Sequence, residues 1–238
     1  MKSLVTGLFV FIFFTPATAQ SCAGCYFFDT GEVEMITYDD KGKEIGRLTY
    51  YISEITKTGN DLIASFTTEE KNNSGVSLSK VPGKYKCGIG SLFMDAAIAI
   101  PKEQMAPYKD MDIQSGAGFV EYPSKLTPGQ TFRDTSFTIQ VLNNGSFFTN
   151  LTLDQTNRKV EAKATLTSQT GTWECLKITY DGKFTTNNGS SPATTFNFKC
   201  TEWFAPGFGI VKSETYSNTN MLISSFAITS VKNNNRTH

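Results

Sequence analysis

The chain has almost no histidine. Its 238 residues contain one, His238, which is also the last residue. A Ser-His-Asp or Cys-His triad needs an imidazole that neighbouring groups hold in place, and a chain terminus does not provide this. The common zinc sites that include histidine are excluded for the same reason. We therefore predict a protein that is not an enzyme and that has no catalytic residues, no cofactor and no metal site; a pair of carboxylates that meets only in the fold stays open as an alternative.

The sequence also lacks an excess of charge and a long apolar run. Its 22 basic residues balance 22 acidic ones, and no basic stripe is present, so we expect no nucleic-acid partner. The longest apolar run, Leu4 to Phe14, has eleven residues. As a helix it would span about 16 Å, whereas the hydrocarbon core of a bilayer is about 30 Å thick. We expect no transmembrane helix in the mature chain.

This apolar run is instead typical of an export signal. Lys2 precedes it, and Ala17-Thr18-Ala19 after it offers the small residues that signal peptidase requires. We predict a signal peptide over residues 1–19 and a secreted mature chain that begins at Gln20. A lipoprotein attached through Cys22 is the alternative, but the residue three places before that cysteine is not the branched apolar residue usual in a lipidation signal.

The mature sequence alternates between turn signals and strand-like runs. Asn-Gly pairs and Asp-rich tetrads suit tight hairpins, because they tolerate a positive φ. The runs between them are rich in Thr, Ile, Val, Phe and Tyr, with apolar and polar residues in alternation, as in half-buried strands. Clear examples are Leu48 to Ile55, Phe147 to Leu153, Val160 to Leu166, Thr194 to Phe204 and Leu222 to Val231.

We predict an all-β fold with about eleven strands joined mainly as hairpins, hence antiparallel. An open flat sheet of this size would leave two long edges, so we expect it to curl into a barrel or half-barrel; a two-sheet sandwich is the alternative. No composition shift divides the chain, so residues 20–231 form one domain and residues 232–238 a polar tail. One short helix is expected at Lys102 to Ala106, because Pro101 suits a helix start and Pro107 ends it. It would lie across the mouth of the sheet or in a surface loop.

Five cysteines remain to be placed. If the hairpin around Asn187-Asn188-Gly189 is centred between the two asparagines, Cys175 lies opposite Cys200. Opposed residues of antiparallel strands are within reach of a disulfide, so we predict a Cys175–Cys200 bridge. Cys22 and Cys25 have the spacing of a redox motif, but they lie beside the predicted cleavage point and lack the strand-to-helix context of such a site.

A second structural feature is the turn Ala205-Pro206-Gly207-Phe208. Proline presets φ at the second position of a type II turn, and glycine accepts the positive φ of the third. We therefore predict that Pro206 and Gly207 form a structural turn between the strand that ends at Phe204 and the strand that begins at Ile210.

The segment Gly171 to Ile178, followed by the hairpin Glu202 to Tyr216, carries a family resemblance. The order of these motifs resembles the TapB-like family of exported Gram-negative bacterial proteins over residues 26 to 231, and it is supported by the segments Thr37 to Lys43, Glu121 to Ser124, Pro128 to Phe132 and Thr156 to Val160. The resemblance implies an all-β fold in the periplasm or cell envelope of a Gram-negative bacterium. It implies no activity, because no active residue is assigned for that family.

Aromatic residues leave two functions open. The chain has 19 Phe, 9 Tyr and 2 Trp residues. If some of them line a cavity inside the curved sheet, the protein binds an apolar or lipidic ligand, which is our first hypothesis. If they fill the interior, the protein is an envelope scaffold or interaction module that recognises a protein partner. The sequence assigns no binding residues to either function.

Overall fold

The structure is a computed structural model that describes residues 26–29, 31–88, 90–100, 102–114, 118–189 and 192–232. The predicted signal peptide, Cys22, Cys25, His238 and residues 233–238 of the predicted tail lie outside these ranges. In the described residues, no helix has the length and apolar character needed to cross a membrane.

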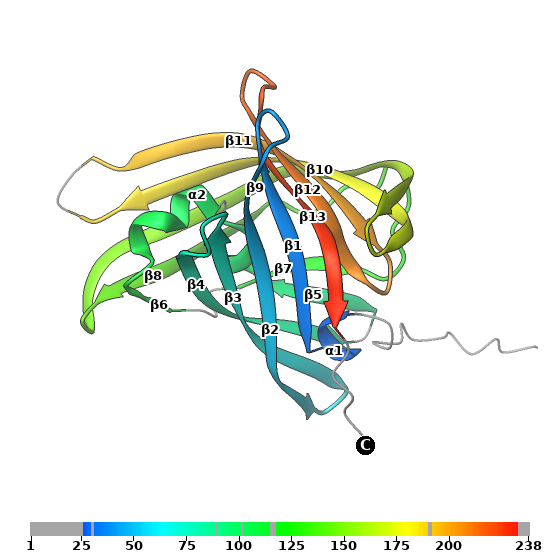
Figure 1. The fold of residues 1–238 in the computed structure, drawn as a ribbon, viewed down its shortest axis with the longest axis horizontal. Coiled ribbons are helices and arrows are strands. Elements are labelled where there is room, and N and C mark those ends of the chain that lie inside the picture. The colour runs from blue at the N-terminus through cyan, green and yellow to red at the C-terminus, as the bar shows by residue number, and fades with distance from the viewer. Residues whose placement is uncertain are drawn as a thin grey trace, which may run out of the picture.

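One antiparallel sheet of thirteen strands makes up the fold, and it curls into a half-barrel (Figure 1). Its order is β6-β8-β9-β10-β11-β12-β13-β1-β2-β3-β4-β5-β7, so β6 and β7 are the two edges. The strands are β1 (Glu32–Asp39), β2 (Glu44–Thr58), β3 (Asp61–Asn72), β4 (Ser77–Gly88), β5 (Ser91–Asp95), β6 (Asp112–Gln114), β7 (Phe119–Pro123), β8 (Thr135–Asn143), β9 (Ser146–Ser168), β10 (Gly171–Asn187), β11 (Thr194–Ala205), β12 (Gly209–Ser217) and β13 (Leu222–Lys232).

The predicted all-β, curled antiparallel architecture is confirmed, with thirteen strands where about eleven were expected. Two of the shortest strands explain part of the difference. β5 lies in a stretch that begins with an unbroken apolar run, and β6 has three residues. Neither is long enough to show the alternation by which longer strands are recognised.

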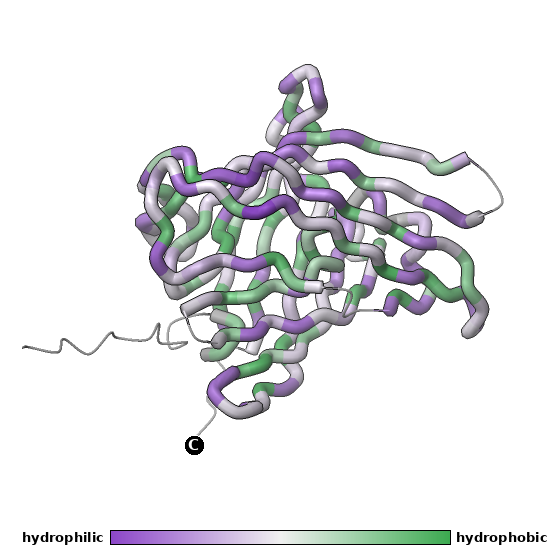
Figure 2. The backbone as a smooth tube through the Cα atoms, turned by 180° about the vertical axis from the view of Figure 1, so that it is seen from behind, coloured by the Kyte–Doolittle hydropathy of each residue, from purple (hydrophilic) through white to green (hydrophobic). Residues whose placement is uncertain are grey.

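Alternation is clear along the longer strands. In Figure 2 hydrophobic and hydrophilic residues follow one another along most of the tube. In β11, Phe198, Cys200 and Phe204 point inward and are buried. Some inward positions hold glycine where two strands bring a ring close to the backbone: a Cβ at Gly182 would overlap the ring of Phe198.

The predicted short helix is present as α2 (Lys102–Met105), and the chain continues as a 3-10 turn, η2 (Ala106–Tyr108). A further 3-10 turn, η1 (Ala96–Ala99), precedes it. Met105 and Tyr108 are buried in one apolar cluster with Ile139, Leu151 and other inward residues of β8–β11. This segment therefore covers the inner face of those strands.

A larger apolar cluster fills the rest of the interior. At one end, the helix α1 (Tyr26–Asp29) inserts Phe27, which is fully buried. The Phe27 ring stacks on Tyr85 with centroids 3.4 Å apart, meets Tyr50 edge-on at 5.2 Å, and lies 5.5 Å from Phe66. The Phe27 ring thus fills the space between aromatic side chains of β2, β3 and β4.

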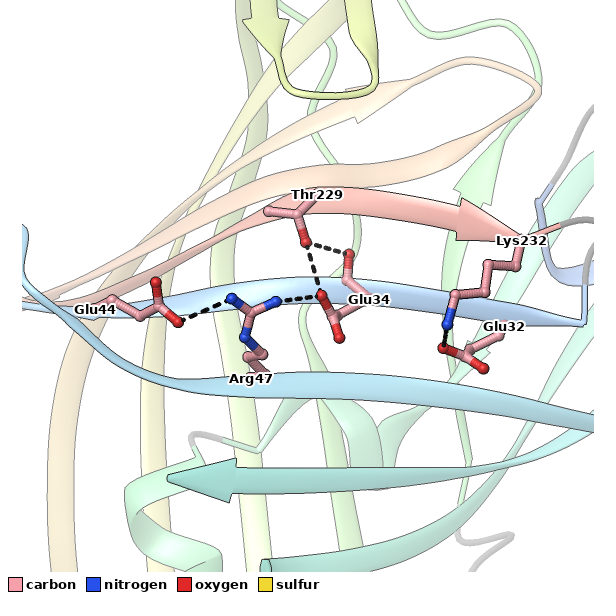
Figure 3. Close-up of polar contacts among 6 residues, drawn as sticks. All are labelled: Glu32, Glu34, Glu44, Arg47, Thr229 and Lys232. Atoms are coloured by element: carbon pink, nitrogen blue, oxygen red, sulfur yellow. Dashed lines mark hydrogen bonds and ion pairs between the residues drawn. The ribbon is translucent and has the colours of Figure 1, made fainter. Parts of the chain in front are cut away.

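The outer face is polar, and ion pairs cross β13, β1 and β2 (Figure 3). Arg47 Nη1 lies 2.6 Å from Glu34 Oε1, and its Nη2 lies 3.3 Å from Glu44 Oε1. Thr229 Oγ1 donates a hydrogen bond of 3.2 Å to the carbonyl oxygen of Glu34, and Lys232 Nζ pairs with Glu32 at 2.5 Å. Exposed pairs of this kind contribute little stability in water, so the stability of the fold comes mainly from the packing of its interior.

Candidate functional site: the interior cavity and its polar cluster

A small cavity of about 70 Å³ lies inside the half-barrel. Side chains from β1, β2, β4, β5, η1 and β10–β13 line it. Most of the lining is apolar, and it includes Met35, Leu48, Met94, Ile98 and Phe198. The same wall holds one carboxylate, that of Glu202, together with the hydroxyl of Ser213 and the thiol of Cys200.

Glu202 is placed here by the alternation of β11. It has the same inward direction as Phe198, Cys200 and Phe204, and it is 3% exposed. Tyr122 Oη donates a hydrogen bond of 2.9 Å to Glu202 Oε2, and the Tyr180 hydroxyl is a second hydrogen-bond partner of the carboxylate. A buried acid is therefore held by two buried phenols.

Burial dominates the electrostatics of this cluster. It raises the pKa of Glu202 above its ordinary value, although the positive charge of Arg158 and the two phenol hydrogen bonds act in the opposite direction. Burial also raises the pKa values of Tyr122 and Tyr180 well above the ordinary value for tyrosine, and that of Cys200 to about 12. Neither the two phenols nor the Cys200 thiol is prepared to act as a nucleophile near neutral pH, because each of these three groups is held in its protonated form.

Arg158 lies on the inner face of β9, and its side chain contacts the edge strand β7. Its guanidinium lies between two rings, 4.3 Å from the Tyr122 centroid and 4.2 Å from the Phe132 centroid. Its Nη1 donates a hydrogen bond of 2.7 Å to the carbonyl oxygen of Glu121 in β7. Tyr122 also stacks on Phe204 of β11, with centroids 4.8 Å apart. The edge strand β7 is thus linked to β9 and β11 by side-chain contacts, without hydrogen-bonded pairing to either of these two strands.

The predicted Cys175–Cys200 disulfide is wrong, because both cysteines are free and buried. Cys200 lies opposite Tyr180, and Cys175 pairs with Ala164 of β9. The cause is the length of the connection. β10 ends at Asn187 and β11 begins at Thr194, so the hairpin is not centred between Asn187 and Asn188, and the register moves by five residues. Cys87 is disulfide-bonded, and its partner lies outside the described residues.

Thiol accessibility tests this assignment. Burial raises the pKa of Cys175 to about 11 and that of Cys200 to about 12, so we expect neither thiol to react with iodoacetamide at pH 8 in the folded protein. After unfolding without a reductant, peptide mapping should find both cysteines alkylated. If Cys175 and Cys200 stay unmodified after unfolding and react only after reduction, the two residues form a disulfide and the assignment as free thiols is wrong.

The predicted turn at Pro206 and Gly207 is present. Gly207 has a φ of +78°, and Phe208 N donates a hydrogen bond of 3.0 Å to the carbonyl oxygen of Ala205. Because proline precedes the residue of positive φ, this geometry is that of a type II turn. A Cβ at Gly207 would have no atom within 4 Å, so the glycine is needed for its backbone conformation alone.

We expect Gly207→Val to lower the thermal midpoint by several degrees. A β-branched residue at this φ costs roughly 1 kcal/mol or more, and each kcal/mol lowers the midpoint by about 2–4 °C in a chain of this size. Gly207→Asn is the matched control, since asparagine tolerates a positive φ. Thermal unfolding followed by circular dichroism measures both; an unchanged midpoint for the valine variant would show that the turn relaxes at no cost.

No site for a metal ion is found in the part of the chain that the structure describes: no three Cys, Asp, Glu or His side chains come together there. The alternation of β11 gave a signal for Glu202, because an acid occupies a position in an otherwise apolar row. Tyr122 and Arg158 lie in two segments that carry the family resemblance, Glu121 to Ser124 and Thr156 to Val160, but no sequence pattern marks either residue as a neighbour of Glu202.

Comparison with known proteins places the chain in a family. Residues 30–228 match the family described as DUF3108-like. The chain belongs to the DUF3108-like family. The TapB-like name suggested by the motifs does not appear in this match and stays a prediction. No curated protein sequence matches the chain.

Solved structures of two exported or lipid-anchored bacterial proteins share the fold of this DUF3108-like chain. A lipoprotein of Parabacteroides distasonis superposes with a TM-score of 0.71 at 21% identity, over 87% of this chain and 99% of the other. An exported protein of Bacteroides fragilis with a YmcC-like fold gives 0.68 at 19% identity, over 85% and 96%. The lipoprotein YmcC of Escherichia coli gives 0.34 at 10% identity, over 83% of each chain. At these identities the first two likenesses show the fold and no more.

Proposed function

We propose that this protein is an exported cell-envelope protein without enzymatic activity, which acts through its surface as a scaffold or interaction module. The observation that carries the proposal is the filled interior. The cavity of about 70 Å³ has the volume of about two water molecules. Pockets that enclose a small-molecule ligand have about 300–1,000 Å³.

The comparison of volumes supports the second of the two functions that the aromatic residues left open. An acyl chain does not fit the described cavity, and even a benzene-sized cavity of about 150 Å³ would be larger. The larger hollows lie outside, among charged side chains of β9–β12 and of β1–β3, with volumes of about 600 and 550 Å³. Among the described residues, the surface hollows therefore offer more space for recognition than this interior cavity does.

Export to the periplasm or envelope is part of the same proposal. It is supported by the signal-like residues 1–19 and by the exported protein and the lipoprotein that share the fold. Attachment through a lipidated Cys22 is the variant of this proposal that the Parabacteroides lipoprotein suggests.

Native mass spectrometry tests the proposal. We expect protein purified from its own envelope under several mild conditions to have the mass of the polypeptide alone, because the described interior cavity is too small for a lipid. Cross-linking in intact cells should link its surface to another protein or to a second copy. A lipid that stays bound in stoichiometric amount would favour the apolar-ligand hypothesis and overturn this proposal.

A further inference from the structure

The disulfide of Cys87 has only two possible partners within the chain. The five cysteines are Cys22, Cys25, Cys87, Cys175 and Cys200. Cys87 is disulfide-bonded, whereas Cys175 and Cys200 are free. Cys87 is also only 2% exposed, which shields its sulfur from a second folded chain. The partner is therefore Cys22 or Cys25, both of which lie outside the described residues.

The helix α1 brings the N-terminal segment to Cys87. Tyr85 and Cys87 are two residues apart in β4, and both point inward and are buried. The Phe27 ring of α1 stacks on the Tyr85 ring with centroids 3.4 Å apart. Phe27, Tyr85 and Cys87 belong to one apolar cluster. Since α1 begins at Tyr26, the chain that carries the two candidate cysteines enters the fold beside this end of β4.

Matching spacings favour Cys25 as the partner. Two residues of a strand span about 6.6–6.8 Å, which is the distance from Tyr85 to Cys87 along β4. Cys25 precedes Phe27 by two residues as well, so their Cα atoms are at most about 7 Å apart. With Phe27 held against Tyr85, this length of chain suffices to bring the preceding cysteine to Cys87, within the roughly 4.4–6.8 Å between Cα atoms that a disulfide requires.

A bridge to Cys22 would have a higher entropic cost. Cys22 precedes Phe27 by five residues, so the chain would have to order three further residues and turn back toward β4. The two pairings can also interconvert. The thiolate of the spare cysteine attacks a bonded sulfur, so one S–S bond breaks as another forms and no oxidant is consumed. This exchange lets the pairing with the shorter connection to Phe27 prevail.

We propose that Cys25 and Cys87 form a disulfide that fastens α1 to β4 and keeps Phe27 in the interior. In its formation the two thiols lose two protons and two electrons. The disulfide of an envelope thiol oxidoreductase accepts them and becomes a dithiol. This inference rests on the proposed function through export alone, because export supplies the oxidising compartment.

The pairing also bears on lipid attachment. A Cys25–Cys87 bridge leaves the sulfur of Cys22 outside the disulfide, whereas a Cys22–Cys87 bridge would exclude a lipid on Cys22. Cys25 remains in the mature chain whether the signal is removed after Ala19 or directly before Cys22. The proposed bridge is thus compatible with both the secreted form and the lipoprotein form.

Differential alkylation of protein purified from its own envelope tests the pairing. The protein is unfolded with iodoacetamide and no reductant, then reduced and treated with N-ethylmaleimide. Fragment-ion spectra must separate the first two cysteines, because Ala23-Gly24 between them offers no common protease site. We expect the maleimide on Cys25 and Cys87, and either iodoacetamide or a lipid on Cys22. Maleimide on Cys22 and Cys87 with iodoacetamide on Cys25, or iodoacetamide on Cys87, would overturn the proposal.

Two matched serine variants give an independent readout. Cys25→Ser should lower the thermal midpoint by about 4–16 °C, since it removes a native disulfide. Cys22→Ser, three residues away, should leave the midpoint unchanged. A midpoint that falls in Cys22→Ser and not in Cys25→Ser would show that Cys22 is the partner.

The cellular location separates a failure of this inference from a failure of the proposed function. If the chain is found in the envelope but its Cys87 is a free thiol, the disulfide is wrong and the proposed function stands. If the chain stays in the cytoplasm but forms the Cys25–Cys87 bridge when refolded in a glutathione redox buffer, export fails and the pairing stands.

Discussion

Replacing Phe27 by alanine is expected to cause the largest loss of stability of any single change considered. Phe27 is fully buried among Tyr50, Phe66 and Tyr85. Phe→Ala substitutions in a core cost about 3–5 kcal/mol, which would lower the thermal midpoint by roughly 6–20 °C in a chain of this size. Denaturant titration of wild type and variant measures the loss. Phe147→Ala is the control, because its ring is half exposed and its removal should cost little.

The Phe27→Ala variant also tests how full the interior is. Tyr50 and Tyr85 touch Phe27 and line the interior cavity, so removing the ring should join the new space to the existing 70 Å³. An apolar cavity of about 150 Å³ binds benzene. We therefore expect benzene to raise the midpoint of the variant and to leave wild type unchanged. Stabilisation of wild type by benzene would show that its interior has more free space than described.

Replacing Glu202 by leucine is expected to have the second-largest effect. The change leaves the buried hydroxyls of Tyr122 and Tyr180 without their acceptor, and each unsatisfied buried group costs about 1–3 kcal/mol. Glu202→Gln keeps an acceptor oxygen, so its free energy of unfolding should fall less than that of Glu202→Leu. If Glu202→Leu is as stable as Glu202→Gln, the hydrogen bonds to the carboxylate do not contribute to stability.

The glutamine variant also predicts a pH dependence. Because burial raises the pKa of Glu202 in the folded state, the native protein binds this proton more tightly than the unfolded chain does. The stability of wild type relative to Glu202→Gln should thus be greatest below the ordinary glutamate pKa, about 4.3. It should fall as the pH rises through the raised folded value. Denaturant titrations of both proteins at several pH values measure this difference; a difference that grows with pH would have the opposite sign and contradict the raised pKa.

Much of the fold was predictable because half-buried strands leave a period of two in the sequence. Long strands such as β9 and β10 show it clearly, and the β8–β9 and β10–β11 connections carry the expected Asn-Gly pairs. The turn at Pro206 and Gly207 was predictable for a local reason, since two adjacent residues set its dihedral angles. The short strands β5 and β6 were not predictable, because pairing with long neighbours stabilises them and their own residues show no period.

The candidate site was only half predictable. Glu202 follows the alternation of β11, but Arg158 does not follow that of β9. Gln155 and Arg158 are both buried although they are three residues apart, because Asn157, with a φ of +54°, shifts the strand between them. A bulge of this kind changes which face a residue occupies, and the sequence does not mark it. The incorrect cysteine pairing has a similar origin, since the length of one loop set the register of two strands.

A crystal structure of the mature protein purified from its own envelope tests the filled interior most directly. We expect the side chains of Met35, Tyr85, Met94 and Phe198 to occupy the interior as described, with electron density for no more than about two water molecules in the remaining space. Continuous elongated density between these side chains, with Phe27 or η1 displaced to admit it, would show a bound apolar ligand and contradict a protein that acts only through its surface.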